Sequence, residues 1–255
     1  MKIIKFKKER DNRYTIFFDD NTKLKLYDDI IIKYNLLNNK EVDAKKLELI
    51  TKDNDSLASY YKAIKYITIK MRTEKEVYIF LCKYFTKQVS NKTIEKLKSE
   101  GYFNNDLYIK SYINDQILLT NNGPNKIKDN LKKLGFEENE INNYLNSIDD
   151  EVWFLKLSKI IDKKINSNHR YGKNKIIMKL VYDLGNAGYY KWMIERTIEK
   201  YDINTDKKII ENEYKKVYNH LAKKYEGENL KYQIKMKLFQ KGFTSEEISE
   251  LLNLN

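Results

Sequence analysis

The sequence predicts a mainly α-helical protein, built from tandem three-helix repeats that form an extended curved array behind a small part containing a β-hairpin. The chain of 255 residues has one proline and eight glycines, so few positions force a helix to break. Apolar residues recur at helical spacing along most of the chain. The same pattern returns at intervals of roughly 50 residues, a period typical of stacked repeats.

The first 53 residues differ from the remainder and predict the β-containing part. Residues 13–18 are β-branched and aromatic, residues 23–27 alternate between polar and apolar, and residues 2–7 alternate more weakly. Residues 19–21 are two aspartates and an asparagine, which are typical of a turn. An antiparallel hairpin or a three-stranded sheet is therefore expected, and it needs a helix or a partner to pack against.

Helices are predicted from residue 28 onward. Asp28 is expected to cap a short helix that runs through Tyr34. Residues 42–51 and 54–71 are expected to form two more helices. The second of these would bury Leu57, Ala58, Tyr61, Ile64 and Ile67.

The repeat is clearest in the segment that begins at Gly123-Pro124. A proline is tolerated in the first turn of a helix, where its missing N–H leaves no hydrogen bond unmade. Ile127 and Leu131 then share one helix face, and Gly135 suits the left-handed position that ends the helix. Residues 137–146 predict a second, short helix.

Counterparts of the Ile127 and Leu131 pair occur three more times, as Val77 and Leu81, Ile176 and Leu180, and Ile234 and Leu238. Any leucine-rich helical protein gives some such pairs by chance. Repetition is favoured because two repeats also match in glycine, aromatic and isoleucine positions. The matched residues are Leu131, Gly135, Phe136 and Ile141 in one repeat and Leu238, Gly242, Phe243 and Ile248 in the other.

These pairs predict how the chain is divided. In the first repeat, a third and longer helix starts near Asp106. The expected parts are residues 1–53, the β-containing part; 54–120, a helical lead-in and the first repeat; 121–168, the second repeat; 169–222, the third; and 223–255, a partial C-terminal repeat.

The formal net charge of +12 indicates an anionic partner. Lysine is abundant everywhere, so solvated helix faces explain many of these charges. Residues 156–179 are more informative, because they contain eight Lys or Arg and a single acid. Tyr171 within this segment and Tyr189-Tyr190 beyond it are candidates for stacking on nucleic-acid bases. Two smaller basic clusters consist of Lys126, Lys128, Lys132 and Lys133, and of Lys231, Lys235, Lys237 and Lys241.

No catalytic, cofactor-binding or metal-binding constellation is found in the sequence. His169 and His220 have no cysteine or carboxylate at ligand spacing, and no glycine-rich phosphate loop is present. Residues 149–151 are best explained as the acidic start of a helix. Cys82 is the only cysteine, so no internal disulfide forms and a cytoplasmic location is expected. No apolar run is long enough to cross a membrane, and the N-terminus is unlike a signal peptide.

Three stretches resemble the RecX family. The first repeat contains Arg72-Thr73-Glu74-Lys75-Glu76-Val77 and then Gly101-Tyr102-Phe103-Asn104-Asn105-Asp106, which are similar to a helix start and a turn of that family. Gly123-Pro124 through Gly135-Phe136 is similar to its next repeat. The predicted sheet followed by Ile32-Lys33-Tyr34-Asn35-Leu36 resembles the longer members from Gram-positive bacteria. The chain departs from the pattern at Phe103, Asn104 and Leu134, and in the irregular stretch at residues 184–189, which leaves the helix boundaries there open.

The resemblance implies a non-catalytic regulator of RecA, in DNA repair, homologous recombination and the SOS response. Such proteins bind the RecA filament on single-stranded DNA and alter its assembly, ATP turnover and strand exchange. A monomer without cofactors is expected. The residues expected to contact the filament or DNA are Arg72, Lys126, Lys128, Lys132, Lys159, Lys163, Arg170, Lys173, Lys175 and Lys179. Two alternatives remain, a stand-alone nucleic-acid-binding helical module and a helical-repeat adaptor between proteins.

Overall fold

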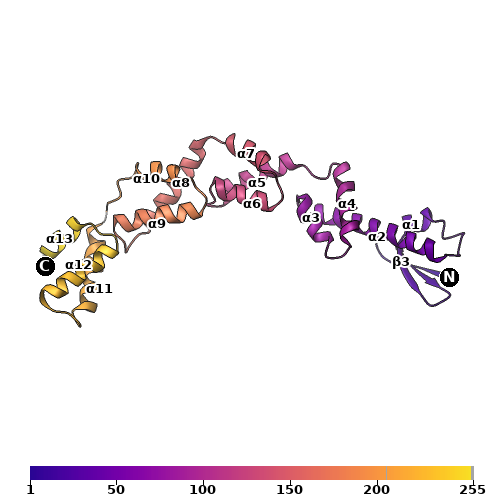
Figure 1. Ribbon diagram of the computed structural model, residues 1–255, viewed down its shortest axis with the longest axis horizontal. Helices are drawn as coiled ribbons and strands as arrows, with labels where there is room; N and C mark the ends of the chain where they lie inside the picture. Colours follow the sequence, from indigo (N-terminus) through magenta and orange to yellow (C-terminus); the bar gives the residue numbers. More distant parts are fainter. Residues whose placement is uncertain (205, 254–255) are drawn as a thin grey trace. The chain divides into compact units, whose positions relative to one another are not determined.

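The computed structural model describes residues 1–204 and 206–253, which form thirteen α-helices and one three-stranded sheet (Figure 1). The predicted mainly α-helical fold with a small N-terminal sheet is confirmed. Thr205, Leu254 and Asn255, which fall in the predicted third and C-terminal repeats, lie outside the described residues. The chain divides into two compact units, an N-terminal unit, Met1–Tyr108, and a C-terminal unit, Ile109–Asn255. None of the described helices is long and apolar enough to cross a membrane.

The N-terminal sheet is an antiparallel meander of β1 (Ile3–Lys8), β2 (Arg13–Phe18) and β3 (Lys23–Tyr27), in that order. Ile16 on the central strand lies opposite Phe6 and Leu24. Ile16 is fully buried, because this face of the sheet packs against the helices that follow. The expected three-stranded sheet is therefore confirmed.

The first two helices correct two expectations. Helix α1 (Asp28–Lys33) has Tyr27 at its N-cap, so Asp28 is already helical, and its carboxylate accepts a hydrogen bond from the backbone N–H of Asp29 at 3.0 Å. Helix α2 (Ala44–Ile67) is continuous where two helices were expected. Its N-cap is Asp43, whose side chain accepts a hydrogen bond from the N–H of Lys46 at 2.7 Å.

Helix α2 is continuous because two of the helix-weakening residues in its middle, Asp53 and Asn54, bind elsewhere. Aspartate and asparagine disfavour helix interiors when their side chains compete for nearby backbone groups. Here Asp53 lies 2.5 Å from Lys33 Nζ and accepts from the Tyr34 hydroxyl at 2.8 Å. Asn54 accepts from the N–H of Tyr27 at 3.1 Å and donates to a carbonyl of β3 at 3.2 Å. These contacts fix the sheet and α1 on α2.

Helices α3 (Glu74–Leu81), α4 (Lys87–Ser99) and α5 (Asn105–Leu119) follow. Thr73 and Glu76 form a capping box at the start of α3, each side chain bonding the other residue's backbone N–H. Val77 packs with the buried side chains of α2 and α4 in one core cluster.

The C-terminal unit continues with eight helices, which are α6 (Pro124–Lys133), α7 (Glu138–Asn146), α8 (Asp150–Asn166), α9 (Lys173–Asn186), α10 (Lys191–Ile198), α11 (Lys207–Leu221), α12 (Gly227–Gln240) and α13 (Ser245–Asn253). Pro124 is the first residue of α6, and Asp149 caps α8, as expected. Gly135 has φ +101°, which confirms its left-handed position. All eight members of the four apolar pairs are buried, so their predicted burial is confirmed. The repeat boundaries stay a prediction.

Two glycine contacts join α6, α9 and α12 end to end, in the same way each time. The N–H groups of Gly123 and Asn125, at the start of α6, donate to the carbonyls of Ala187 and Gly188 at 2.7 and 3.0 Å. At the start of α9, the N–H groups of Gly172 and Asn174 donate to Lys241 and Gly242 at 3.0 and 3.1 Å. Each contact pairs unsatisfied donors at one helix start with carbonyls that follow another helix's end.

A side chain on any of these glycines would separate the two backbones. A Cβ on Gly123 would lie 2.7 Å from the carbonyl carbon of Gly188, and a Cβ on Gly172 would lie 2.5 Å from the carbonyl oxygen of Gly242. Gly188 and Gly242 also adopt φ +90° and +88°, a region that favours glycine. Gly188 belongs to the irregular stretch noted in the sequence, and this requirement explains why α9 ends there.

Replacing Gly123 with alanine is expected to lower the free energy of unfolding by about 1–3 kcal/mol, the usual range for overpacking a close contact. Gly185→Ala is the matched control, because a Cβ there meets nothing within 4 Å. Because Gly185 lies in a helix, this control should leave the free energy of unfolding unchanged or raise it by up to about 1 kcal/mol. Urea unfolding of both variants measures the difference, and equal stability would show that the glycine contact is unimportant.

Candidate functional site

Arg72 is the one predicted binding residue in the N-terminal unit, and it is engaged there. Its Nη1 lies 3.3 Å from Glu76 Oε1, and its guanidinium lies 4.1 Å from the centre of the Tyr66 ring. The side chain is only 15% exposed. These contacts give Arg72 a structural role at the start of α3.

The basic cluster on α6 is partly neutralised. Lys128 and Lys132 both pair with Glu138 of α7, at 2.7 and 2.8 Å. Hydrogen bonds from these two ammonium groups lower the pKa of Glu138 to about 2, so the carboxylate stays charged. Lys126 is exposed, although its backbone packs against Gly188 in the glycine contact.

Four of the predicted binding residues are exposed and lie on or next to α8 and α9. Lys159 and Lys163 are exposed and lie four residues apart on one face of α8. Arg170 follows α8, and Lys179 lies on α9; both are exposed. In the described part of the chain, none of these four cations has a carboxylate within ion-pair distance.

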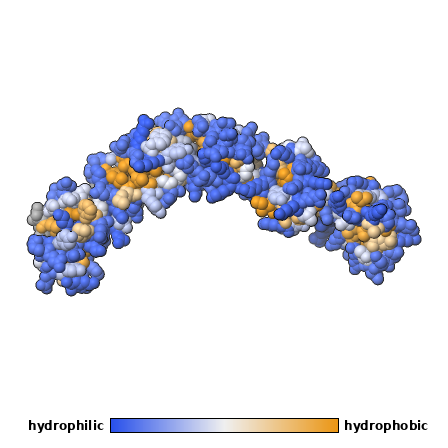
Figure 2. All heavy atoms as spheres, in the orientation of Figure 1, coloured by the Kyte–Doolittle hydropathy of each residue, from blue (hydrophilic) through white to orange (hydrophobic). Residues whose placement is uncertain are grey.

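Lys173 and Lys175 are half-buried at the start of α9. The backbone of Lys175 packs against Gly242. Substitutions at Lys175 would therefore disturb this glycine contact, which is the joint between α9 and α12, as well as the surface charge. Figure 2 shows that most of the face in view is hydrophilic, with apolar residues in scattered patches.

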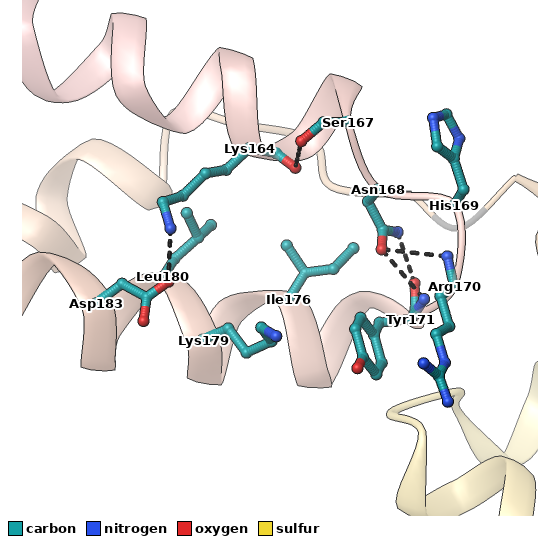
Figure 3. A pocket seen from close by; sticks show the side chains of 10 residues that line it. All are labelled: Lys164, Ser167, Asn168, His169, Arg170, Tyr171, Ile176, Lys179, Leu180 and Asp183. Atoms are coloured by element: carbon teal, nitrogen blue, oxygen red, sulfur yellow. Dashed lines mark hydrogen bonds and ion pairs between the residues drawn. The ribbon is translucent and has the colours of Figure 1, made fainter.

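A pocket of about 430 Å³ lies between α8 and α9, next to these cations. In Figure 3, Ile176 and Leu180 point from α9 toward α8. An ion pair between Lys164 and Asp183, 2.5 Å apart, lies at one end. The loop that contains Arg170 and Tyr171 lies at the other end, while His169 points away from the other lining side chains.

The basic segment of the sequence indicated Arg170, Tyr171 and Lys179. It did not indicate Asp183, because Asp183 lies outside residues 156–179. The spacing of Ile176, Lys179, Leu180 and Asp183 places them on neighbouring positions of one helix surface. A helical projection of α9 would therefore have identified this group. Among the described residues, no group of three His, Cys, Asp or Glu side chains could hold a metal ion.

Lys156 belongs to the basic segment but has an internal role. Its Nζ donates to the carbonyls of Gln116 at 2.8 Å and Asn122 at 3.1 Å, and so holds the backbone just before Gly123. Burial lowers the pKa of the Lys156 ammonium to about 8, from an ordinary value of 10.5. Lys156 therefore supports the joint between α6 and α9 rather than the surface charge.

The free energy of unfolding should depend on the ionisation of Lys156. Between pH 8 and 10.5, Lys156 binds more protons in the unfolded chain than in the folded chain, so this residue's contribution to stability rises with pH across that window. The stability difference between the wild type and Lys156→Met should therefore grow in favour of the wild type from pH 8 to 10.5. The control, Lys159→Met, makes the same substitution at an exposed lysine of the same helix. Urea titrations across this range test both, and a constant difference for Lys156→Met would contradict the assignment.

The chain was compared with known proteins by sequence and by structure. No family model matches the chain. It is 29% identical over 257 residues to the regulatory protein RecX of Streptococcus agalactiae serotype III (strain NEM316), covering 99% of this chain and 98% of the relative. It is 26% identical over 258 residues to RecX of Staphylococcus haemolyticus (strain JCSC1435), covering 98% and 96%.

Solved structures are similar in fold. A crystal structure of regulatory protein RecX matches with a TM-score of 0.64 and 22% identity, over 78% of this chain and 98% of that chain. The structure of RecX from Lactobacillus salivarius matches with a TM-score of 0.53 and 24% identity, over 58% and 97%. The resemblance to the RecX family, and to longer members from Gram-positive bacteria, is confirmed.

Proposed function

We propose that this chain, which is similar to RecX regulatory proteins over nearly its whole length, is a non-catalytic modulator of the RecA recombinase. It would bind the RecA filament on single-stranded DNA and alter filament assembly, ATP turnover and strand exchange. It would act as a monomer in the cytoplasm, in DNA repair, homologous recombination and the SOS response. The observation that carries this proposal is the 99% coverage of the chain by a relative named a regulatory protein.

The structure supports a mode of action based on several linked contacts. Helices α6, α9 and α12 are joined by two identical backbone contacts, so equivalent surfaces return at fixed intervals within the C-terminal unit. A filament also presents equivalent surfaces at fixed intervals. Weak contacts linked in this way combine, and avidity can exceed the affinity of one contact by roughly 10²–10⁴.

A second function, direct binding of nucleic acid without RecA, is favoured by the four unpaired cations around α8 and α9. A pull-down separates the two functions. If the chain modulates RecA, RecA with single-stranded DNA and nucleotide retains it more strongly than bare DNA does. If it binds nucleic acid on its own, both retain it equally. Retention by neither would overturn both functions.

Reversing the charge of Lys159 and Lys163 should weaken modulation of RecA. We expect Lys159→Glu/Lys163→Glu to raise the concentration needed for half-maximal change in filament ATP turnover by about tenfold, since charge reversal on a complementary surface suppresses binding. The control, Lys223→Glu/Lys224→Glu, changes the net charge equally at exposed positions near the end of α11. Equal effects of the two double variants would show that total charge, and not this surface, is responsible.

A further inference from the structure

We propose that the pocket between α8 and α9 receives one nucleotide of single-stranded DNA, with its base against Tyr171 and its phosphate near Arg170 and Lys179. This inference deepens the proposed function by assigning the DNA part of the partner to named residues. The pocket volume, about 430 Å³, lies within the range of sites that hold small molecules.

The pocket is positively charged because its only carboxylate already has a partner. Asp183 is paired with Lys164, so these two charges cancel and do not contribute to the net charge of the pocket. Arg170 and Lys179 remain, and no carboxylate of the described residues pairs with either. Two unpaired cations beside a pocket attract an anion, and a phosphate diester satisfies both at once.

An aromatic ring lies beside these cations. The Lys179 ammonium is 4.7 Å, and the Arg170 guanidinium 5.7 Å, from the centre of the half-buried Tyr171 ring. A base that stacks on Tyr171 takes the place of one of these cations, and the displaced cation turns to the phosphate. An acidic peptide would use the cations but not the ring, so a nucleotide matches the group better. A base within a duplex is already stacked and paired, which selects a single strand.

The loop that presents Tyr171 is fixed before any ligand binds. Asn168 donates from Nδ2 to the carbonyl of Tyr171 at 2.7 Å, and its Oδ1 accepts from the N–H of Tyr171 at 3.1 Å (Figure 3). The next residue, Gly172, donates to the carbonyl of Lys241 at 3.0 Å. The backbone of Tyr171 is therefore held by the Asn168 side chain and by the neighbouring Gly172 contact, so little conformational entropy is lost on binding.

The test uses the full chain without RecA and follows the anisotropy of a labelled oligothymidylate. Tyr171→Ala should weaken binding about fivefold or more, the effect of losing one stacked base, while Tyr171→Phe should bind like the wild type. Against an abasic oligomer, which keeps the phosphates, Tyr171→Ala should bind like the wild type. Arg170→Gln/Lys179→Gln should weaken both oligomers and reduce the slope of log affinity against log salt by about 0.7, the value for one phosphate of a single strand. Lys223→Gln/Lys224→Gln is the control, and circular dichroism checks that each variant is folded.

Three outcomes would overturn the pocket assignment. One is oligothymidylate binding by Tyr171→Ala that equals the wild type. Another is an equal loss with the glutamine control, which would indicate general attraction. The third is competition by polyglutamate that depends on Arg170 and Lys179 more strongly than DNA binding does, which would assign the pocket to an acidic protein segment. RecA is absent from this assay, so failure of RecA modulation in the pull-down leaves the result for the pocket unaffected.

Discussion

The C-terminal unit depends on a backbone contact that occurs twice, between Gly123 and Gly188 and between Gly172 and Gly242. A helix start has N–H groups without partners and carries a partial positive charge; a helix end has carbonyls without partners and carries a partial negative charge. Joining α9 to α6, and α12 to α9, satisfies both sets of groups in the interior. The approach is close enough that only hydrogen fits where other residues have Cβ. The apolar pairs are buried by the helices next to each of these three; Ile234 and Leu238 of α12, for example, share one core cluster with side chains of α11 and α13.

Two charged side chains, Lys156 and the buried Glu213, support these joints. Lys156 holds the carbonyl of Asn122, which precedes the first joint. Glu213, which is 1% exposed, pairs with Lys216 at 2.7 Å and with Lys241, whose carbonyl accepts the second joint's hydrogen bond. Burial by itself would raise the pKa of Glu213, but the two lysines lower it below the ordinary value. Removing either lysine leaves the buried Glu213 carboxylate without full compensation, so Lys216 and Lys241 are constrained by structure although they count toward the +12.

Features that depend on local residues could be predicted from the sequence. The strands, the proline start of α6, the cap by Asp149 and the left-handed Gly135 each follow from a few neighbouring residues. Features that depend on distant partners could not. The continuity of α2 requires β3 and α1 to bind Asp53 and Asn54, and the pocket requires Asp183 to pair with Lys164 across two helices. The glycines were visible in the sequence, but their partners lie about 65–70 residues away, and no local pattern identifies such a pair.

Helix α9 connects the joints to the candidate site. Its start is fixed by Gly172 on the turn after α12, and the turn at its end receives the start of α6. Tyr171 directly precedes the first of these contacts, and Lys179 lies on the helix between them. A change at either joint would therefore move the ring and the ammonium relative to α8. Because Tyr171 directly precedes the Gly172 contact, the glycine contacts that join the three helices also determine where the ring and the ammonium lie.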